Sequence, residues 1–201
     1  MNTLFKIVLI SFLLLSINSY ARVFDVADVV KPGKIDLGLE SEFIINKGFG
    51  FHAIGSANFG MSDVVDYGVF IGTGNLPFQL GFFSKYLLFP DIRGQFGLAF
   101  VGGLKFIRDS GKNVLSIMLH PIISKSFIDN KLTITPYGSI QSEIWLWRSS
   151  LDLPVRFVGG TKFAHKEIEN WSFLGELGVG LTKIAYSYIR VGAKYLIDND
   201  F

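Results

Sequence analysis

The fold is decided by residues 34–45, which read KIDLGLESEFII. From Ile35 to Phe43 the odd-numbered positions are apolar apart from Ser41. The even-numbered positions between them are charged or small: Lys34, Asp36, Gly38, Glu40, Glu42. Successive side chains of a strand point to opposite faces, so this period of two predicts a strand with one apolar and one polar face.

The same alternation recurs through most of the chain and predicts about ten strands joined by short turns. Every connection is too short for a crossover helix, so the strands should pair as an antiparallel meander. Eight strands would be the alternative if one hairpin is miscounted. The predicted strands are 34–45, 49–59, 64–74, 78–89, 95–107, 114–126, 132–144, 154–163, 171–181 and 186–197.

Composition narrows the class of protein. The 201 residues are 49% hydrophobic, 15% aromatic and only 18% charged, with a mean hydropathy of +0.40. Soluble domains typically carry about 25% charged residues, and disordered chains are poor in aromatics. The net charge of +2 gives no electrostatic footprint for nucleic acid. The absence of cysteine excludes disulfides, thiol chemistry and a bacterial lipoprotein anchor.

The first residues read as an export signal. Lys6 precedes a short apolar run over residues 7–17, and small residues lead up to Ala21. This order is typical of a cleaved signal peptide, and the run is too short for a membrane anchor. The sequence therefore predicts a signal peptide over 1–21, a periplasmic lead-in over 22–33 and a barrel over 34–201. Residues 22–33 could also tuck into the barrel mouth.

Three features favour a membrane barrel, with apolar side chains facing lipid and polar ones facing the lumen. The strands are long, glycine concentrates on the polar face, and aromatic residues such as Phe89, Trp145, Trp171 and Tyr186 fall near strand ends. The charges of the strands share the polar face: Lys34, Asp36, Glu40, Glu42, Asp66, Lys85, Lys105, Glu143, Arg156, Lys162, Glu176, Arg190 and Lys194. Trp145 and Trp147 share its parity, which predicts either a bulge or a strand that has left the membrane.

The last strand carries a recognisable motif. Arg190, Gly192, Tyr195 and Ile197 occupy the polar, glycine, aromatic and apolar positions, and the chain ends in Phe201. This pattern resembles the C-terminal β-signal of bacterial outer-membrane proteins. The resemblance implies outer-membrane lipid and the barrel-assembly machinery as partners, and it identifies no activity. Phe201 lies four residues beyond the rest of the motif, which departs from the usual pattern.

The charged lumen has two interpretations. Buried charges must be paired, so a salt-bridge lattice that fills the barrel is one. A narrow, mixed-charge channel for small solutes is the other. Closure of the barrel should bring Glu40 and Glu42 near Arg190 and Lys194. Neighbouring strands should likewise bring Glu143 near Arg156, and Lys162 near Glu176.

Two rival functions stay open. An outer-membrane lipid-modifying hydrolase would need a histidine and a serine in contact at a lipid–water boundary. His52 and Ser56, like His120 and Ser124, are four residues apart, which in a strand is about 13 Å. A secreted lipid-binding barrel would turn the Phe-rich face inward. We expect no cofactor and no metal site.

Overall fold

A computed structural model describes residues 26–46, 50–74, 78–109, 112–146 and 151–198. Its long strands are β1 (Lys34–Ile44), β2 (Gly50–Gly60), β3 (Val65–Gly74), β4 (Phe78–Phe89), β5 (Gly97–Asp109), β6 (Lys112–Ser124), β8 (Leu132–Leu146), β10 (Val155–His165), β11 (Trp171–Gly180) and β12 (Tyr188–Asp198). Two short strands, β7 (Phe127–Asp129) and β9 (Leu151–Asp152), pair only with β8.

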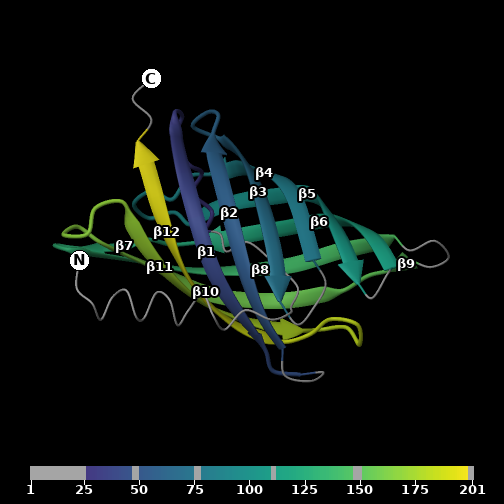
Figure 1. The fold of residues 1–201 in the computed structure, drawn as a ribbon. Coiled ribbons are helices and arrows are strands. Elements are labelled where there is room, and N and C mark those ends of the chain that lie inside the picture. Colours follow the sequence, from purple (N-terminus) through teal and green to yellow (C-terminus); the bar gives the residue numbers. More distant parts are fainter. Residues whose placement is uncertain (1–25, 47–49, 75–77, 110–111, 147–150, 199–201) are drawn as a thin grey trace, which may run out of the picture.

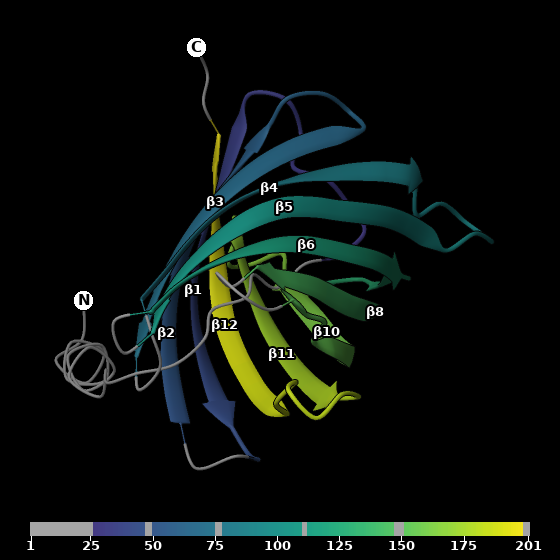
Figure 2. The same cartoon turned by 90° about the vertical axis from the view of Figure 1, so that its right-hand side faces the viewer.

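The ten long strands of the described chain form one closed antiparallel barrel (Figures 1 and 2). Each pairs with its neighbours along the chain, β12 pairs with β1, and β8 pairs with β10 across the short β9. The predicted all-β, up-and-down barrel of ten strands is therefore confirmed, and the eight-strand alternative is wrong. The described residues contain no helix with the length and hydropathy needed to span a membrane.

The barrel has an apolar outside and a polar inside. Leu39, Phe82 and Phe157 point outward and are 54%, 51% and 52% exposed. Glu42 and Arg190 point inward and are fully buried. The soluble barrel with an inward Phe-rich face is therefore wrong. The alternation that predicted strands also predicted which side chains fill the interior.

Inward aromatic rings lie over inward glycines on the neighbouring strand. Gly68 is directly opposite Phe83, and a Cβ on Gly68 would fall 2.1 Å from that ring. Gly81 is opposite Phe70 in the same way, at 2.2 Å. Two tyrosines repeat the arrangement, Tyr137 over Gly160 and Tyr188 over Gly178. The concentration of glycine on the polar face thus reflects space that these rings occupy.

Two of the aromatic residues predicted near the strand ends do not face outward. Trp145 and Tyr186 are buried in the interior, whereas Phe89 and Trp171 are exposed as expected. The pairing of β6 with β8 runs without a register shift from Leu115↔Leu146 to Leu119↔Ser142. Trp145 therefore continues the regular inward series of β8, and no bulge occurs there. Trp147 lies outside the described residues.

Candidate functional site

The interior charges gather around Arg190, near the start of β12. This guanidinium donates from Nε to Glu42 Oε2 at 3.0 Å, and a second nitrogen of the fork contacts the same carboxylate. Its Nη1 lies 3.6 Å from Glu40 and 3.6 Å from Glu176. Glu42 and Glu176 are the direct partners of Arg190 on its two neighbouring strands. Strand register therefore places one cation between carboxylates on both sides.

Arg190, Glu40, Glu42 and Glu176 are called here the Arg190 cluster. Tyrosine hydroxyls bind its carboxylates. Tyr137 and Tyr188 each donate their hydroxyl to Glu176, at 2.7 and 2.6 Å. Tyr186 donates to Glu42 Oε1 at 3.3 Å. Hydrogen bonds to a carboxylate offset part of the free energy of removing its charge from water. The charged residues were predicted from parity, but the tyrosine donors were missed, although all three share the polar parity of their strands.

A second group of charges surrounds Glu143, which lies near the end of β8 and so toward the same end of the barrel as Arg190. Lys105 Nζ lies 2.7 Å from its carboxylate, and Arg156 Nη1 lies 3.9 Å away. Ser116 and Trp145 donate to the same Oε2 atom at 3.0 and 2.6 Å. All five side chains are at least nine-tenths buried. The inward position of Trp145 is thus explained by a hydrogen bond to a buried carboxylate.

One arginine joins the two groups. Arg156 donates from Nε to the carbonyl oxygen of Tyr186 at 3.0 Å, and its guanidinium lies 4.1 Å from the centre of that ring. Tyr186 in turn contacts Glu42 of the Arg190 cluster. Polar contacts therefore run without interruption from Glu143 to Arg190 across the interior. The predicted proximities of Glu40 and Glu42 to Arg190, and of Glu143 to Arg156, are confirmed by these distances.

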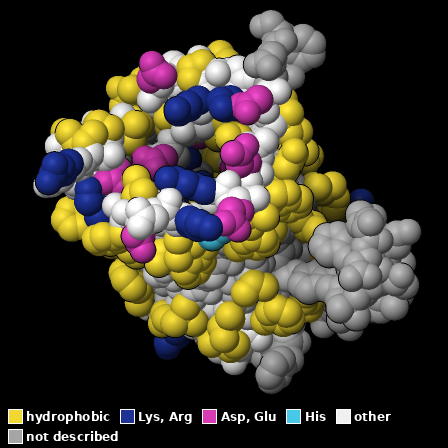
Figure 3. Space-filling view, turned by 90° about the vertical axis from the view of Figure 1, so that its left-hand side faces the viewer, with side chains coloured by type: hydrophobic (Ala, Val, Ile, Leu, Met, Phe, Trp, Pro, Cys, Tyr) yellow, Lys and Arg dark blue, Asp and Glu magenta, His cyan; other side chains and the backbone are white. Residues whose placement is uncertain are grey.

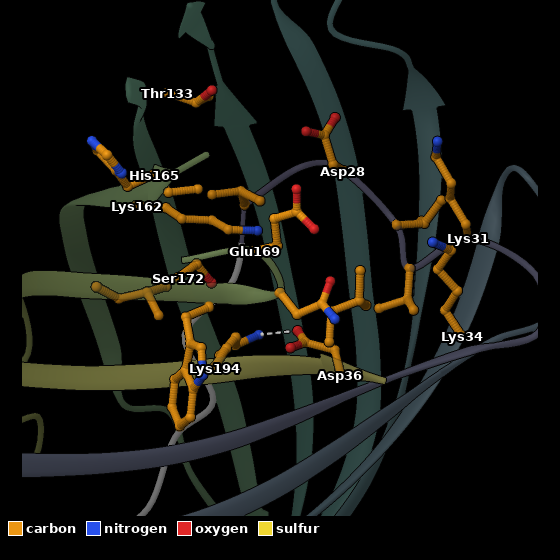
Figure 4. Close-up of a pocket in the computed structure, with 18 of the residues that line it drawn as sticks. Asp28, Lys31, Lys34, Asp36, Thr133, Lys162, His165, Glu169, Ser172 and Lys194 are labelled. Carbon is orange, nitrogen blue, oxygen red and sulfur yellow. Dashed lines mark ion pairs between the residues drawn. The ribbon is translucent and has the colours of Figure 1, made fainter. Parts of the chain in front are cut away.

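One predicted cross-strand pairing, Lys162 opposite Glu176, is wrong. Lys162 lies opposite Leu174 on β11, and the residue opposite Glu176 is Gly160. The two-residue offset carries Lys162 toward the end of the barrel, where its side chain points into a pocket (Figure 4). Parity gave the correct face of the strand, but the register depends on where the turn between β10 and β11 begins. That turn covers residues 166–170, and its sequence left the register open.

The remaining predicted charges line the barrel mouth at which β1 begins and β12 ends, called here the N-terminal mouth. Each of the lysines at positions 34, 85 and 194 has an acidic partner on the adjacent strand. Lys85 Nζ lies 3.3 Å from Asp66, its direct partner across β3 and β4. The other two pairs are Lys194 with Asp36, at 3.2 Å, and Lys34 with Asp198.

The N-terminal mouth opens into a vestibule of about 740 Å³. Basic and acidic side chains gather around this opening, and apolar side chains cover the surface outside it (Figure 3). Lys31, Lys162 and Glu169 are among its lining residues, as are the pair of Lys194 and Asp36 (Figure 4). A cavity in the middle of the barrel, beside Phe70 and Tyr137, is only about 30 Å³. The interior is therefore wide at one end and filled at its centre.

The three histidines lie in the interior and at the N-terminal mouth. His52 and His120 are buried in the interior, and His52 Nδ1 lies 3.6 Å from Glu42 of the Arg190 cluster. His165 lies in the vestibule wall, where its Nδ1 accepts a hydrogen bond from the backbone of Glu167. Two of the three rings thus face charged lumen rather than the lipid–water boundary.

One acidic residue at the mouth lies outside the strands. Burial raises the pKa of Asp91, but hydrogen bonds from Lys125 and from the backbone N–H of Ser126 outweigh this and hold that pKa below its ordinary value. Lys125 also donates to the carbonyl oxygens of Ile92 and Gln95. Lys125 therefore fastens the loop between β4 and β5.

The residues of the predicted β-signal have separate places. Arg190 is the centre of the interior cluster, whereas Tyr195 faces outward and its ring lies 5.0 Å from that of Trp171. Gly192 lies opposite Glu40, and Ile197 opposite Ile35, along the seam that closes the barrel. Phe201 lies outside the described residues.

Taken together, fold and interior define a closed ten-stranded barrel, within the described residues, that is apolar outside and charged inside. No protein-family model matches the chain, and no curated protein matches its sequence.

Several solved structures have a similar fold at low sequence identity. One, described as KdgM porin, is 12% identical with a TM-score of 0.42, covering 80% of this chain and 98% of that one. A de novo designed transmembrane β-barrel is 12% identical with a TM-score of 0.40, covering 84% and 99%. The translocator domain of the autotransporter NalP from Neisseria meningitidis is 11% identical with a TM-score of 0.37, covering 81% and 87%. Similarity at this level identifies neither a family nor an activity.

Proposed function

We propose that this chain is a bacterial outer-membrane β-barrel with a lumen that is closed at rest. Its primary role is then structural, and small solutes pass only through a narrow route. The observation that carries the proposal is the inverted distribution of side chains. Large apolar residues cover the outside, and paired charges fill the inside. Water would penalise such a surface, whereas lipid matches it.

The backbone supports a location in lipid. A membrane-spanning sheet cannot leave strand edges unpaired, because no water is present to bond their N–H and C=O groups. Here β1 pairs with β12 over the full length of β1, from Lys34↔Asp198 to Ile44↔Tyr188. The predicted signal peptide and the resemblance to a β-signal support insertion into the outer membrane by the barrel-assembly machinery.

The interior supports a closed resting state. The Arg190 cluster and the Glu143 group lie on the strands from β5 through β12 to β1, and their side chains are almost without exposed surface. Phe70 of β3 and Phe83 of β4 pack in one apolar cluster on the remaining wall. Because polar and apolar groups both meet at the centre, an ion would have to displace paired side chains to pass. The proposed role of the charge network is therefore to hold the lumen closed.

Single-channel recording in planar lipid bilayers tests this proposal. The parent chain should insert and conduct little. Glu40→Ala/Glu42→Ala should raise the steady conductance at least about twofold, because it removes two carboxylates from the Arg190 cluster in the lumen. Asp129→Ala/Glu167→Ala, which removes the same charge from two exposed positions that do not line the vestibule, should behave as the parent. A large steady conductance in the parent would overturn the closed lumen. A folded chain that stays in solution would overturn the membrane location.

A further inference from the structure

Residues 26–30, called here the N-terminal segment, enter the barrel before the first strand begins. Val26 is 5% exposed and Ala27 is fully buried, packed against Leu87 and Ala99 of the barrel wall. The segment has no strand partner along this stretch. It is therefore held in the mouth by side chains of the wall rather than by a ladder of strand hydrogen bonds.

The wall recognises the main chain of this segment. Ser124 Oγ accepts a hydrogen bond from the N–H of Ala27 at 3.1 Å. Asp66 Oδ2 accepts one from the N–H of Val30 at 2.9 Å. Lys85 Nζ donates to the carbonyl oxygens of Val26, at 3.3 Å, and of Asp28. Three side chains from β3, β4 and β6 thus satisfy four main-chain groups, which any extended peptide would offer.

Glycines make the room for the segment. A Cβ on Gly60 would fall 1.9 Å from the carbonyl oxygen of Lys31 and 2.5 Å from that of Val30. A Cβ on Gly97 would lie 3.2 Å from the Cβ of Ala27. Any larger residue at Gly60 would push the segment away from the wall, so the two glycines complete a shaped site.

The site does not depend on its occupant for charge balance. Asp66 and Lys85 are direct cross-strand partners and lie 3.3 Å apart, so each keeps an opposite charge when the segment leaves. Release therefore leaves no buried charge without a partner, and the strands of the barrel stay paired. On its other side the segment borders the vestibule of about 740 Å³, into which it could move.

We propose that Asp66, Lys85 and Ser124 form a binding site for an extended peptide, and that the N-terminal segment is its resident, displaceable occupant. The ligand class is a main chain in extended form with a small side chain at the position of Ala27. The inference rests on the proposed function in one respect, that release of the segment widens one mouth of a membrane barrel.

Cross-linking tests the position of the segment, because the chain contains no cysteine of its own. Disulfides need Cβ atoms about 3.5–4.5 Å apart, close to the distance between positions 27 and 97. Ala27→Cys/Gly97→Cys should therefore cross-link on oxidation in the detergent-folded chain. The control pair is Ala27→Cys/Ser116→Cys. Ser116 lies opposite Lys105, which is eight residues further along β5 than Gly97. That separation is about 26 Å, so no cross-link should form. Cross-linking of both pairs, or of neither, would overturn the placement.

Thiol protection tests displacement. The Ala27→Cys thiol should react with a maleimide at least about a hundredfold more slowly than the thiol of Asn130→Cys, an exposed turn residue, because reaction requires release. An excess of the peptide DVADVVK, residues 25–31, should accelerate the reaction about tenfold by competing for the site. A scrambled peptide should not. Equal rates with both peptides would overturn the displaceable occupant.

Variants of the wall identify the residues that bind. Ser124→Ala and Lys85→Met should each accelerate reaction of the Ala27→Cys thiol about tenfold or more. Lys166→Met, which removes the same charge from an exposed position at the same mouth, should leave the rate unchanged. Ser124→Ala keeps the test decisive if Lys85→Met fails to fold, and its failure to accelerate the reaction would overturn the site. These readouts are made in detergent, so they stand or fall separately from membrane conductance.

Discussion

Replacement of Arg190 by methionine should be the most destabilising single change in the charged interior. It removes the one cation shared by Glu40, Glu42 and Glu176, whose carboxylates lie 3.6 Å or less from the guanidinium. Breaking a buried ion pair by removing one partner costs about 3–5 kcal/mol, because the other charge stays buried. Since three carboxylates lose their partner, we expect a loss of about 4–5 kcal/mol in the free energy of unfolding.

Urea unfolding of the barrel in lipid vesicles, followed by tryptophan fluorescence, measures this loss. A change of about 4 kcal/mol corresponds to nearly a thousandfold change in the folding equilibrium constant. Arg190→Lys should lose about 1–3 kcal/mol, because an ammonium keeps the charge but cannot contact three carboxylates with a planar fork. Lys131→Met breaks an ion pair whose partners are 67% and 62% exposed, and should cost about 0–1 kcal/mol. If Arg190→Met were as mild as Lys131→Met, the central role of Arg190 would be refuted.

Three further predictions follow from local contacts. Gly68→Ala should cost about 1–3 kcal/mol of unfolding free energy, because the new methyl group would displace the Phe83 ring. Gly175→Ala, whose new methyl group meets no atom within 4 Å, should be nearly neutral. Equal urea midpoints for the two variants would contradict the packing of rings over glycines. Asp91→Asn should remove a pH-dependent part of the free energy of unfolding, because the pKa of Asp91 is lowered in the folded state. The contribution of Asp91 is complete above the ordinary aspartate pKa of about 3.9, and it is lost as the pH falls through the lowered pKa. The difference in unfolding free energy between parent and Asp91→Asn should therefore be constant from neutral pH down to that value and shrink below it, and a constant difference at every pH would contradict the hydrogen bonds assigned to Asp91. Trp145→Phe should destabilise the barrel by about 1–3 kcal/mol through loss of the indole donor to Glu143, and an unchanged urea midpoint would argue against an inward Trp145.

The sequence was sufficient to predict the strands and their faces because the period of two is a direct consequence of backbone geometry. The predicted range 78–89 coincides with β4, and most others differ by one or two residues at an end. The same parity placed Glu40, Glu176 and Arg190 in the interior. It could not tell that Tyr188 and Phe70 would join them as ring fillers, since an aromatic residue on the polar face suits either a girdle or a packed lumen.

The details that could not be predicted depend on register and on contacts between distant segments. Lys162 misses Glu176 because the turn between β10 and β11 sets an offset of two residues. The contact of Ala27 with Ser124 joins residues 97 positions apart and involves main-chain groups, which leave no mark in the sequence. Gly60 was assigned to a turn, although its missing side chain also admits the carbonyl oxygens of the N-terminal segment.

The central claim is that the apolar outside of this barrel faces lipid, and spin labelling in vesicles tests it most directly. Labels on Leu39→Cys, Phe82→Cys and Phe157→Cys, each replacing an outward side chain at least half exposed, report the medium around the barrel. The account predicts that oxygen, which is concentrated in lipid, relaxes all three labels more strongly than a water-soluble nickel complex does. Stronger relaxation by nickel at these positions would show that the Phe-rich face lies in water, and would contradict the membrane barrel.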